Sequence, residues 1–174
     1  RKFVCLPIIL ISFFSIESFS ESIEEVVVKG SWREKSANQE DSSFILFSSK
    51  NVKAQSMKHF EQLSFLVPNL NFAPSDSRAR YFQIRGIGER SGYQGTPNSS
   101  VGLLIDDIDY SGQGGIATTF DVNQIEVFRG PQGARIGANA LAGLIYIQTK
   151  DPTDTFEATS EATIGTYGTK STGI

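Results

Sequence analysis

Three carboxylates, Asp106, Asp107 and Asp109, lie just after the apolar run VGLLI at residues 101–105. Clustered carboxylates can bind a divalent cation or act as a general acid and base. A calcium loop spreads its oxygen ligands over about twelve residues and closes with a glutamate, which is missing here. Because paired aspartates at the end of a strand favour a tight turn, we predict a turn at Asp106 and Asp107. An exported enzyme that uses the three aspartates is an alternative.

The glycine-rich stretch at residues 130–143 raises the question of a phosphate-binding loop. A P-loop requires Gly-Lys-Ser/Thr after its spacer, but Gly137 is followed by Ala138 and Asn139. A dinucleotide fingerprint requires a long helix after its glycines, and the stretch is too short for one. The 16 basic and 19 acidic residues form no basic patch. We therefore expect neither a nucleotide ligand nor a nucleic-acid partner.

Residues that commonly bind metals are scarce in this sequence. Cys5 is the only cysteine and His59 the only histidine. Near His59, the side chains of Met57, Lys58 and Glu61 do not complete a ligand set. We predict no metal site, no disulfide and no cofactor.

The first residues have the pattern of a secretory signal peptide. Two basic residues precede the apolar run FVCLPIILISFF at residues 3–14, which is too short to span a bilayer. Ser18 and Ser20 provide small side chains for cleavage before Glu21. We therefore expect residues 1–20 to direct export and to be removed, with a buried N-terminal strand as the alternative.

The elements around these residues follow from hydrophobic periodicity. A helical stretch is predicted from about residue 49 to Pro68, because Phe60, Leu63 and Val67 recur at spacings of three and four. Within residues 125–150, two apolar strands are predicted on either side of the turn at Gly130 and Pro131, the second with both faces buried. Strands are expected at residues 44–47, 69–72, 81–88, 101–105, 125–128 and 144–149.

The sequence of residues 125–150, IEVFRGPQGARIGANALAGLIYIQTK, resembles the end of the plug domain of TonB-dependent outer-membrane receptors. The segment YFQIRGIG at residues 81–88 is also similar to a plug strand. Ile136, Ala142 and Tyr146 stand where the family usually has an aromatic residue, glycine and asparagine. These are packing substitutions that leave the turn glycines in place.

The resemblance implies an α+β fold, in which a plug domain with a small mixed β-sheet and short helices is followed by the first strand of a transmembrane β-barrel. The expected parts are a signal peptide (1–20), a TonB-box segment and flexible linker (21–43), the plug (44–152) and the start of the barrel (153–174). Residues 156–164 alternate with period two, as a barrel strand does. Gly165 to Gly168 then form a turn, and a second strand begins at Lys170. We expect the chain to be the N-terminal part of a longer protein.

The resemblance also implies functional residues near the mature N-terminus. A short β-prone segment beside polar residues is suited to strand addition to a partner's sheet. It resembles the TonB box, and the polar stretch 30–43 reads as a flexible tether. The residues that would bind TonB, which works with its inner-membrane energising complex, are Glu24, Glu25, Val26, Val27 and Val28.

Two further sets of residues are candidates by the same resemblance. Arg85 and Arg129 each end an apolar strand directly before glycine, and they would pair with carboxylates of the barrel. Tyr93, Gln94 and Asn98, in the twelve-residue loop 89–100, would face the ligand.

The function implied is energy-coupled uptake of a nutrient, such as an iron-siderophore complex, without enzymatic chemistry. The plug would sit inside a barrel in the outer membrane, with its N-terminal segment in the periplasm and a small-molecule ligand outside. An exported periplasmic or surface β-rich ligand-binding module is the alternative. The sequence does not identify the ligand.

Overall fold

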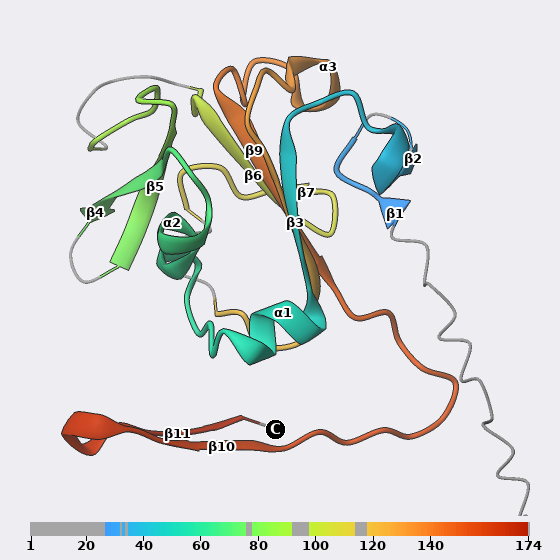
Figure 1. Cartoon of the computed structure of the whole chain (residues 1–174), viewed down its shortest axis with the longest axis vertical. Helices are drawn as coiled ribbons and strands as arrows, with labels where there is room; N and C mark the ends of the chain where they lie inside the picture. Colours follow the sequence, from blue (N-terminus) through green and yellow to red (C-terminus); the bar gives the residue numbers. More distant parts are fainter. Residues whose placement is uncertain are drawn as a thin grey trace, which may run out of the picture.

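The computed structural model describes residues 27–31, 33, 35–75, 78–91, 98–113 and 118–173. At the centre of this part of the chain lies a five-stranded mixed sheet (Figure 1). Its strands β9 and β6 are parallel, and every other neighbouring pair is antiparallel. In spatial order the strands are β3 (Phe44–Ser48), β8 (Val122–Phe128), β9 (Gly143–Thr149), β6 (Val101–Ile105) and β7 (Ile108–Asp109).

The two strands predicted around the glycine-rich stretch are the middle of this sheet. In β9 both faces are buried, which confirms the prediction for residues 144–149. In β8 the last four residues are also buried, since the chain covers the sheet on both sides. Successive side chains of a strand point to opposite faces, so Val127 and Ile145 belong to one apolar cluster and Phe128 and Leu144 to the other.

Short helices and a second hairpin cover the first face of the sheet (Figure 1). The buried side chains here include Phe60, Leu63 and Val67, as their spacing predicts. The predicted helical stretch is interrupted between Ala54 and Phe60, because the chain turns at Ser56 with a φ of 50°. The covering elements are α1 (Ser49–Ala54), η2 (Phe60–Gln62), α2 (Leu63–Leu66), β4 (Leu70–Ser75) and β5 (Arg78–Ile84).

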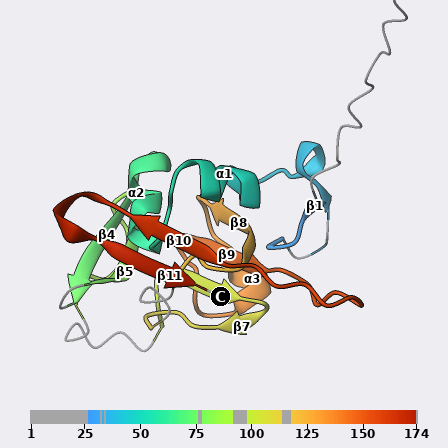
Figure 2. The ribbon, with the colours of Figure 1, turned by 90° about the horizontal axis from the view of Figure 1, so that it is seen from below.

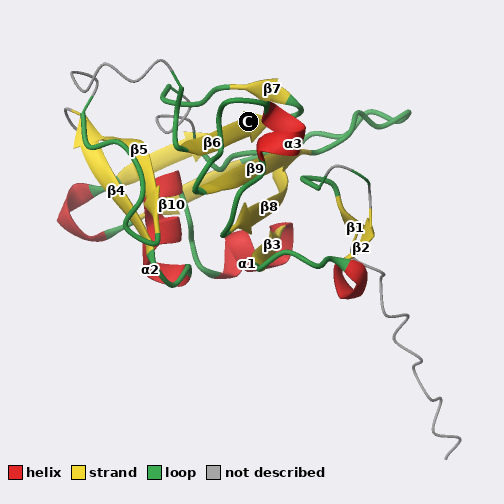
Figure 3. Cartoon of the chain, turned by 90° about the horizontal axis from the view of Figure 1, so that it is seen from above, coloured by secondary structure: helices red, strands yellow, loops and turns green. Residues whose placement is uncertain are grey.

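The second face is covered by the N-terminal segment and a one-turn helix. Val28 and Ala140 are fully buried here with Phe128 and Leu144. Figure 3 shows the β1/β2 pair and the β4/β5 hairpin on opposite sides of the central strands. The elements of the second face are β1 (Val27–Val28), β2 (Lys35–Ser36), η1 (Ala37–Gln39) and α3 (Gly133–Ile136).

The end of the chain forms a separate antiparallel hairpin, drawn across the body of the molecule in Figure 2. It consists of β10 (Glu161–Ile164), η5 (Thr166–Gly168) and β11 (Lys170–Gly173). The predicted turn and second strand are present, whereas the first strand is shorter than the predicted range 156–164. Side chains are highly exposed here, including Phe156 at 96% and Ile164 at 86%. Among the described residues, no helix has the length and apolar character needed to cross a membrane.

Gly143 offers a test of how tightly the central strands pack. A Cβ atom there would lie 2.3 Å from the carbonyl oxygen of Phe128 and 2.5 Å from Cδ1 of Ile84. We expect Gly143→Ala to lower the free energy of unfolding by about 2 kcal/mol or more, as overpacking does. Urea unfolding of this chain measures the effect. In the control Gly130→Ala the new Cβ has no atom within 4 Å, and a loss equal to that of Gly143→Ala would contradict the packing argument.

Candidate functional site

Glu126 is a fully buried carboxylate in the middle of β8. Its Oε1 accepts a hydrogen bond of 2.8 Å from the backbone N–H of Lys29, and its Oε2 accepts one of 2.8 Å from the N–H of Gly30. The side-chain amide of Gln124 donates a third hydrogen bond to Oε1. The N-terminal segment therefore supplies two of the donors that make burial of this carboxylate possible.

Alternation along β8 explains why the carboxylate points to the second face. Glu126 lies between Ile125 and Val127, which belong to the first-face cluster, so its side chain shares a face with Phe128. In the sequence, Glu126 is visible only as one residue of the plug-like segment 125–150. The signal that could have identified it is a charged residue within a strand whose two faces are both buried.

Burial raises the pKa of Glu126 above its ordinary value of 4.5. The hydrogen bonds from Lys29, Gly30 and Gln124, and the positive charge of Arg135, offset part of this effect. Burial, with the nearby Asp107 carboxylate, also raises the pKa of Tyr146 to about 12.

Two more side chains hold the backbone on either side of Lys29 and Gly30. The amide of Gln124 donates to the carbonyl oxygen of Val27 at 2.9 Å, and Nη1 of Arg135 donates to the carbonyl oxygen of Ser31 at 2.6 Å. The guanidinium of Arg135 also stacks 5.1 Å above the ring centroid of Tyr146. Residues 27–31 are thus bound through their main chain, by side chains of β8 and α3.

The predicted TonB-binding residues fall partly within this segment. Glu24, Glu25 and Val26 lie outside the described residues. Val27 is 38% exposed and Val28 is fully buried, and together they pair with Lys35 and Ser36. Their role in binding TonB stays a prediction.

The polar stretch predicted to be a flexible tether contains short ordered elements in the structure. Residues 35–39 form β2 and η1, and Ala37 packs against the second-face cluster. The backbone of Lys29, Gly30 and Ser31, just before these elements, is held by hydrogen bonds to Glu126 and Arg135. That residues 30–43 act as a flexible linker stays a prediction.

The two arginines proposed to contact a barrel have different settings. Arg129 is half-buried; its Nη2 donates to Ser43 Oγ at 2.9 Å, and its Nε is buried without a partner among the described residues. Arg85 is exposed and has a φ of 53°, in the tight turn between Ile84 and Ile87. An arginine at positive φ costs conformational energy that glycine or asparagine would avoid.

Each of the three aspartates has hydrogen-bond or ion-pair partners elsewhere in the chain. Asp106 and Asp107 have φ values of 48° and 68° and form the turn between β6 and β7, which confirms the predicted turn. Asp106 accepts hydrogen bonds from the N–H and hydroxyl of Thr149. Asp107 forms an ion pair with Arg135.

Asp109 is tied to a different part of the chain. It accepts hydrogen bonds from the N–H of Ser111 and the side-chain amide of Asn139. Within the described ranges, no three His, Cys, Asp or Glu side chains are grouped so as to hold a metal ion.

Of the predicted ligand-facing residues, Tyr93 and Gln94 lie outside the described part of the chain, and Asn98 is exposed. The two ends of their loop are joined, because the buried carboxylate of Glu89 accepts hydrogen bonds from the N–H and hydroxyl of Ser100. Contact with a ligand stays a prediction.

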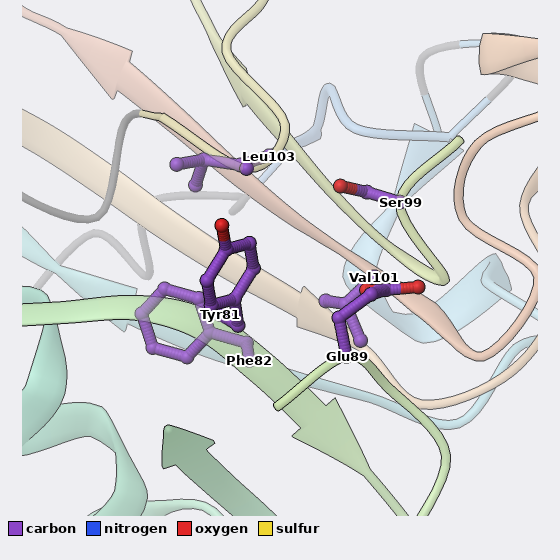
Figure 4. A pocket seen from close by; sticks show the side chains of 7 residues that line it. Tyr81, Phe82, Glu89, Ser99, Val101 and Leu103 are labelled. Atoms are coloured by element: carbon purple, nitrogen blue, oxygen red, sulfur yellow. The ribbon is translucent and has the colours of Figure 1, made fainter. Parts of the chain in front are cut away.

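The space beside these loop ends is small. Figure 4 shows Tyr81 and Phe82 of β5 close to Val101 and Leu103 of β6, with Glu89 alongside. The gap that they line has a volume of about 10 Å³, enough for about one water molecule. This gap is too small for a ligand larger than a water molecule.

A wider polar groove lies beside the N-terminal segment. Its volume is about 460 Å³, and ion-paired Asp107 and Arg135 both contribute to it. The remaining lining residues are Lys29, Ser31, Asp106, Tyr146, Gln148, Thr149, Lys150, Asp151 and Pro152.

Comparison with known families and curated proteins gives consistent matches. The family described as "TonB-dependent Receptor Plug Domain" matches residues 36–144. The pesticin receptor of Yersinia pestis is 30% identical over 128 residues, covering 73% of this chain and 18% of the receptor. The pesticin receptor of Yersinia enterocolitica is 29% identical over 135 residues, covering 77% of this chain and 19% of the receptor. The chain therefore spans about a fifth of the length of these curated relatives.

Solved structures have the same fold. The ferric yersiniabactin uptake receptor FyuA from Yersinia pestis is 26% identical, with a TM-score of 0.56 over 74% of this chain and 19% of that receptor. The pyoverdine outer membrane receptor from Pseudomonas aeruginosa gives a TM-score of 0.66 over 84% of this chain and 21% of that receptor. At 16% identity this second match bears on the fold alone.

The raised pKa of Glu126 predicts a pH-dependent effect of Glu126→Gln. In the folded state the pKa of Glu126 lies above 4.5, so protonation of this side chain stabilises the folded state. This contribution to the free energy of unfolding is fully present below pH 4.5 and is lost as the pH rises through the folded-state pKa. The glutamine variant lacks this titration. We therefore expect the free energy of unfolding of the wild type, relative to the variant, to decrease from pH 4.5 towards neutrality. Urea unfolding at a series of pH values measures this difference, and a constant difference would contradict it.

Proposed function

Since this chain belongs to the TonB-dependent receptor plug domain family, we propose that it closes the pore of an outer-membrane receptor and takes part in energy-coupled uptake of a nutrient. The match over residues 36–144, together with a mixed sheet like that of solved receptors, is the observation that carries this proposal. The plug would sit inside a barrel in the outer membrane, with its N-terminal segment in the periplasm.

An iron-siderophore complex is the ligand class that we propose. FyuA, at 26% identity, is described as a ferric yersiniabactin uptake receptor. In this chain the ligand would contact the loop that contains Tyr93, Gln94 and Asn98, whose ends are held together by Glu89 and Ser100. Iron enters this proposal as cargo.

TonB is the proposed periplasmic partner, energised by its inner-membrane complex. It would bind residues 24–28 by strand addition, in which backbone hydrogen bonds join the segment to the partner's sheet. The valines at positions 26–28 favour the extended conformation that this requires.

Val27→Pro in the full-length receptor tests this function. Proline removes a backbone donor and fixes φ, so we expect loss of energy-dependent uptake of a ferric siderophore while ligand binding to whole cells is unchanged. Val27→Ala is the matched control and should transport nearly normally. Normal uptake by the proline variant would refute the assignment of TonB binding to this segment.

Arg85 and Arg129 are proposed to pair with barrel carboxylates. Support comes from the buried Nε of Arg129, which has no partner in the part of the chain that the structure describes, and from the positive φ of Arg85. Unfavourable backbone conformations are often retained at functional positions.

Substitution of the two arginines should distinguish a barrel contact from a role within the plug. In the full-length receptor, Arg129→Ala would leave a buried carboxylate unpaired and cost about 3 to 5 kcal/mol. In this chain alone it removes the hydrogen bond to Ser43, worth about 1 kcal/mol. Arg85→Asn should weaken the receptor but not this chain, since asparagine tolerates positive φ. Denaturant unfolding of both forms provides the comparison, and equal losses in the two would argue against barrel contacts.

A further inference from the structure

We infer that Asn139 is a positioning residue for ligand binding, because its side chain fixes the backbone directly beside the exposed Asn98. The hold on the backbone stands on contacts within the chain. Its effect on ligand binding rests on the proposed function, because it takes Asn98 to contact the ligand.

The residue that follows Asn98 is held by both of its main-chain polar atoms. The N–H of Ser99 donates to Oδ1 of Asn139 at 3.0 Å, and its carbonyl oxygen accepts from the N–H of Ala140 at 3.0 Å. Ala140 is fully buried in the second-face cluster, so this part of the glycine-rich stretch is itself anchored. The backbone after Asn98 is therefore bound to a fixed support.

The next residue, Ser100, is held in the same manner. Its carbonyl oxygen accepts from the N–H of Ala142 at 2.8 Å, and its N–H donates to the carboxylate of Glu89 at 2.9 Å. Glu89 and Ser99 both line the small gap shown in Figure 4. All four main-chain polar atoms of the two serines thus have partners, and two of these partners are side chains.

The orientation of the Asn139 amide is set by a carboxylate at the end of β7. Its Nδ2 donates to Oδ2 of Asp109 at 2.7 Å, while Oδ1 of Asp109 accepts from the N–H of Ser111 at 2.9 Å. Partial burial acts to raise the pKa of Asp109, but these hydrogen bonds outweigh burial, and the pKa lies below its ordinary value of 3.8. An ionised carboxylate only accepts hydrogen bonds, so the amide points its NH2 group at Asp109 and its oxygen at Ser99.

This arrangement suits a side chain that has to meet a ligand. Asn98 is exposed, so it is accessible while the backbone beside it is held. A side chain on a fixed backbone loses less conformational entropy on binding than one on an unsupported segment. Release of Ser99 should therefore weaken binding of a ligand that contacts Asn98.

Exchange of the two side chains that face each other provides a test that restores every bond. Asn139→Asp alone places two carboxylates together and removes the donor to Asp109, so it should release Ser99. In the double variant Asp109→Asn with Asn139→Asp, the amide at position 109 accepts from Ser111 and donates to position 139. The carboxylate at position 139 then accepts from Ser99.

Electron paramagnetic resonance of the full-length receptor tests the hold on the backbone. The probe is a nitroxide attached at Asn98→Cys, with other cysteines replaced. We expect Asn139→Asp to increase the mobility of the nitroxide and the exchanged double variant to restore the wild-type spectrum. The control Thr149→Val loses a hydrogen bond to Asp106 at the opposite end of β9 and should leave the spectrum unchanged. An unchanged spectrum in Asn139→Asp would overturn the positioning role.

Equilibrium binding of ferric yersiniabactin, the complex named for FyuA, to non-energised cells that carry the full-length receptor tests the effect on the ligand. We expect Asn139→Asp to raise Kd at least about fivefold, the effect of losing one hydrogen bond, with an unchanged number of binding sites. The exchanged double variant should bind within about twofold of the wild type. Fewer sites at an unchanged Kd would mean that Asn139 supports folding alone, and would overturn the inference.

Asn98→Ala separates this inference from the proposed function. Because Asn139 acts through Asn98, Asn139→Asp should weaken binding much less in the Asn98→Ala background than in the wild type. An equal loss in both backgrounds would overturn the role of Asn139 while Asn98 remained a ligand contact. If Asn98→Ala alone leaves Kd unchanged, or the wild type does not bind the probe, the failure belongs to the proposed function. The effect on binding is then overturned with it, whereas the nitroxide spectra still decide the hold on Ser99.

Discussion

The hydrogen bonds between Glu126 and the backbone of Lys29 and Gly30 are the interaction on which the second face of the sheet depends. A carboxylate without partners would be too costly to bury at the centre of β8. The N-terminal segment supplies donors and, at the same time, covers Phe128 and Leu144 with Val28. The hydrogen bonds to Glu126 and the burial of the apolar side chains on this face thus depend on the same segment. Removal of that segment would remove both.

The strands at the centre of the fold could be predicted from sequence because each is specified by a pattern within a few consecutive residues. Apolar runs at residues 101–105, 125–128 and 144–149 are long enough to form strands, and Gly130 with Pro131 ends one of them. The packed N-terminal segment could not be predicted in this way. Its main-chain contacts connect residues that lie 96 and 97 positions apart, and they leave little trace in local composition.

The same contrast applies to the candidate site. Asp106 and Asp107 were predicted to form a turn from their type and position, and they do, but their partners Thr149 and Arg135 come from distant elements. The strand end at Arg85 was also predicted from the following glycines. The positive φ of Arg85 could not be predicted, because arginine rarely adopts that conformation.

The position of β9 between β8 and β6 has a consequence for the order of folding. The central strand is the last of the five to appear in the sequence, so the residues of the antiparallel pairs β6/β7 and β3/β8 are synthesised before those of β9. Until residues 143–149 arrive, β6 and β8 each lack a neighbour, and unpaired strand edges invite association with other chains. Parallel pairing of β6 with β9 also needs a long crossover, and such non-local pairings are slow to form. The edges of β6 and β8 that face β9 are therefore covered only once β9 is in place.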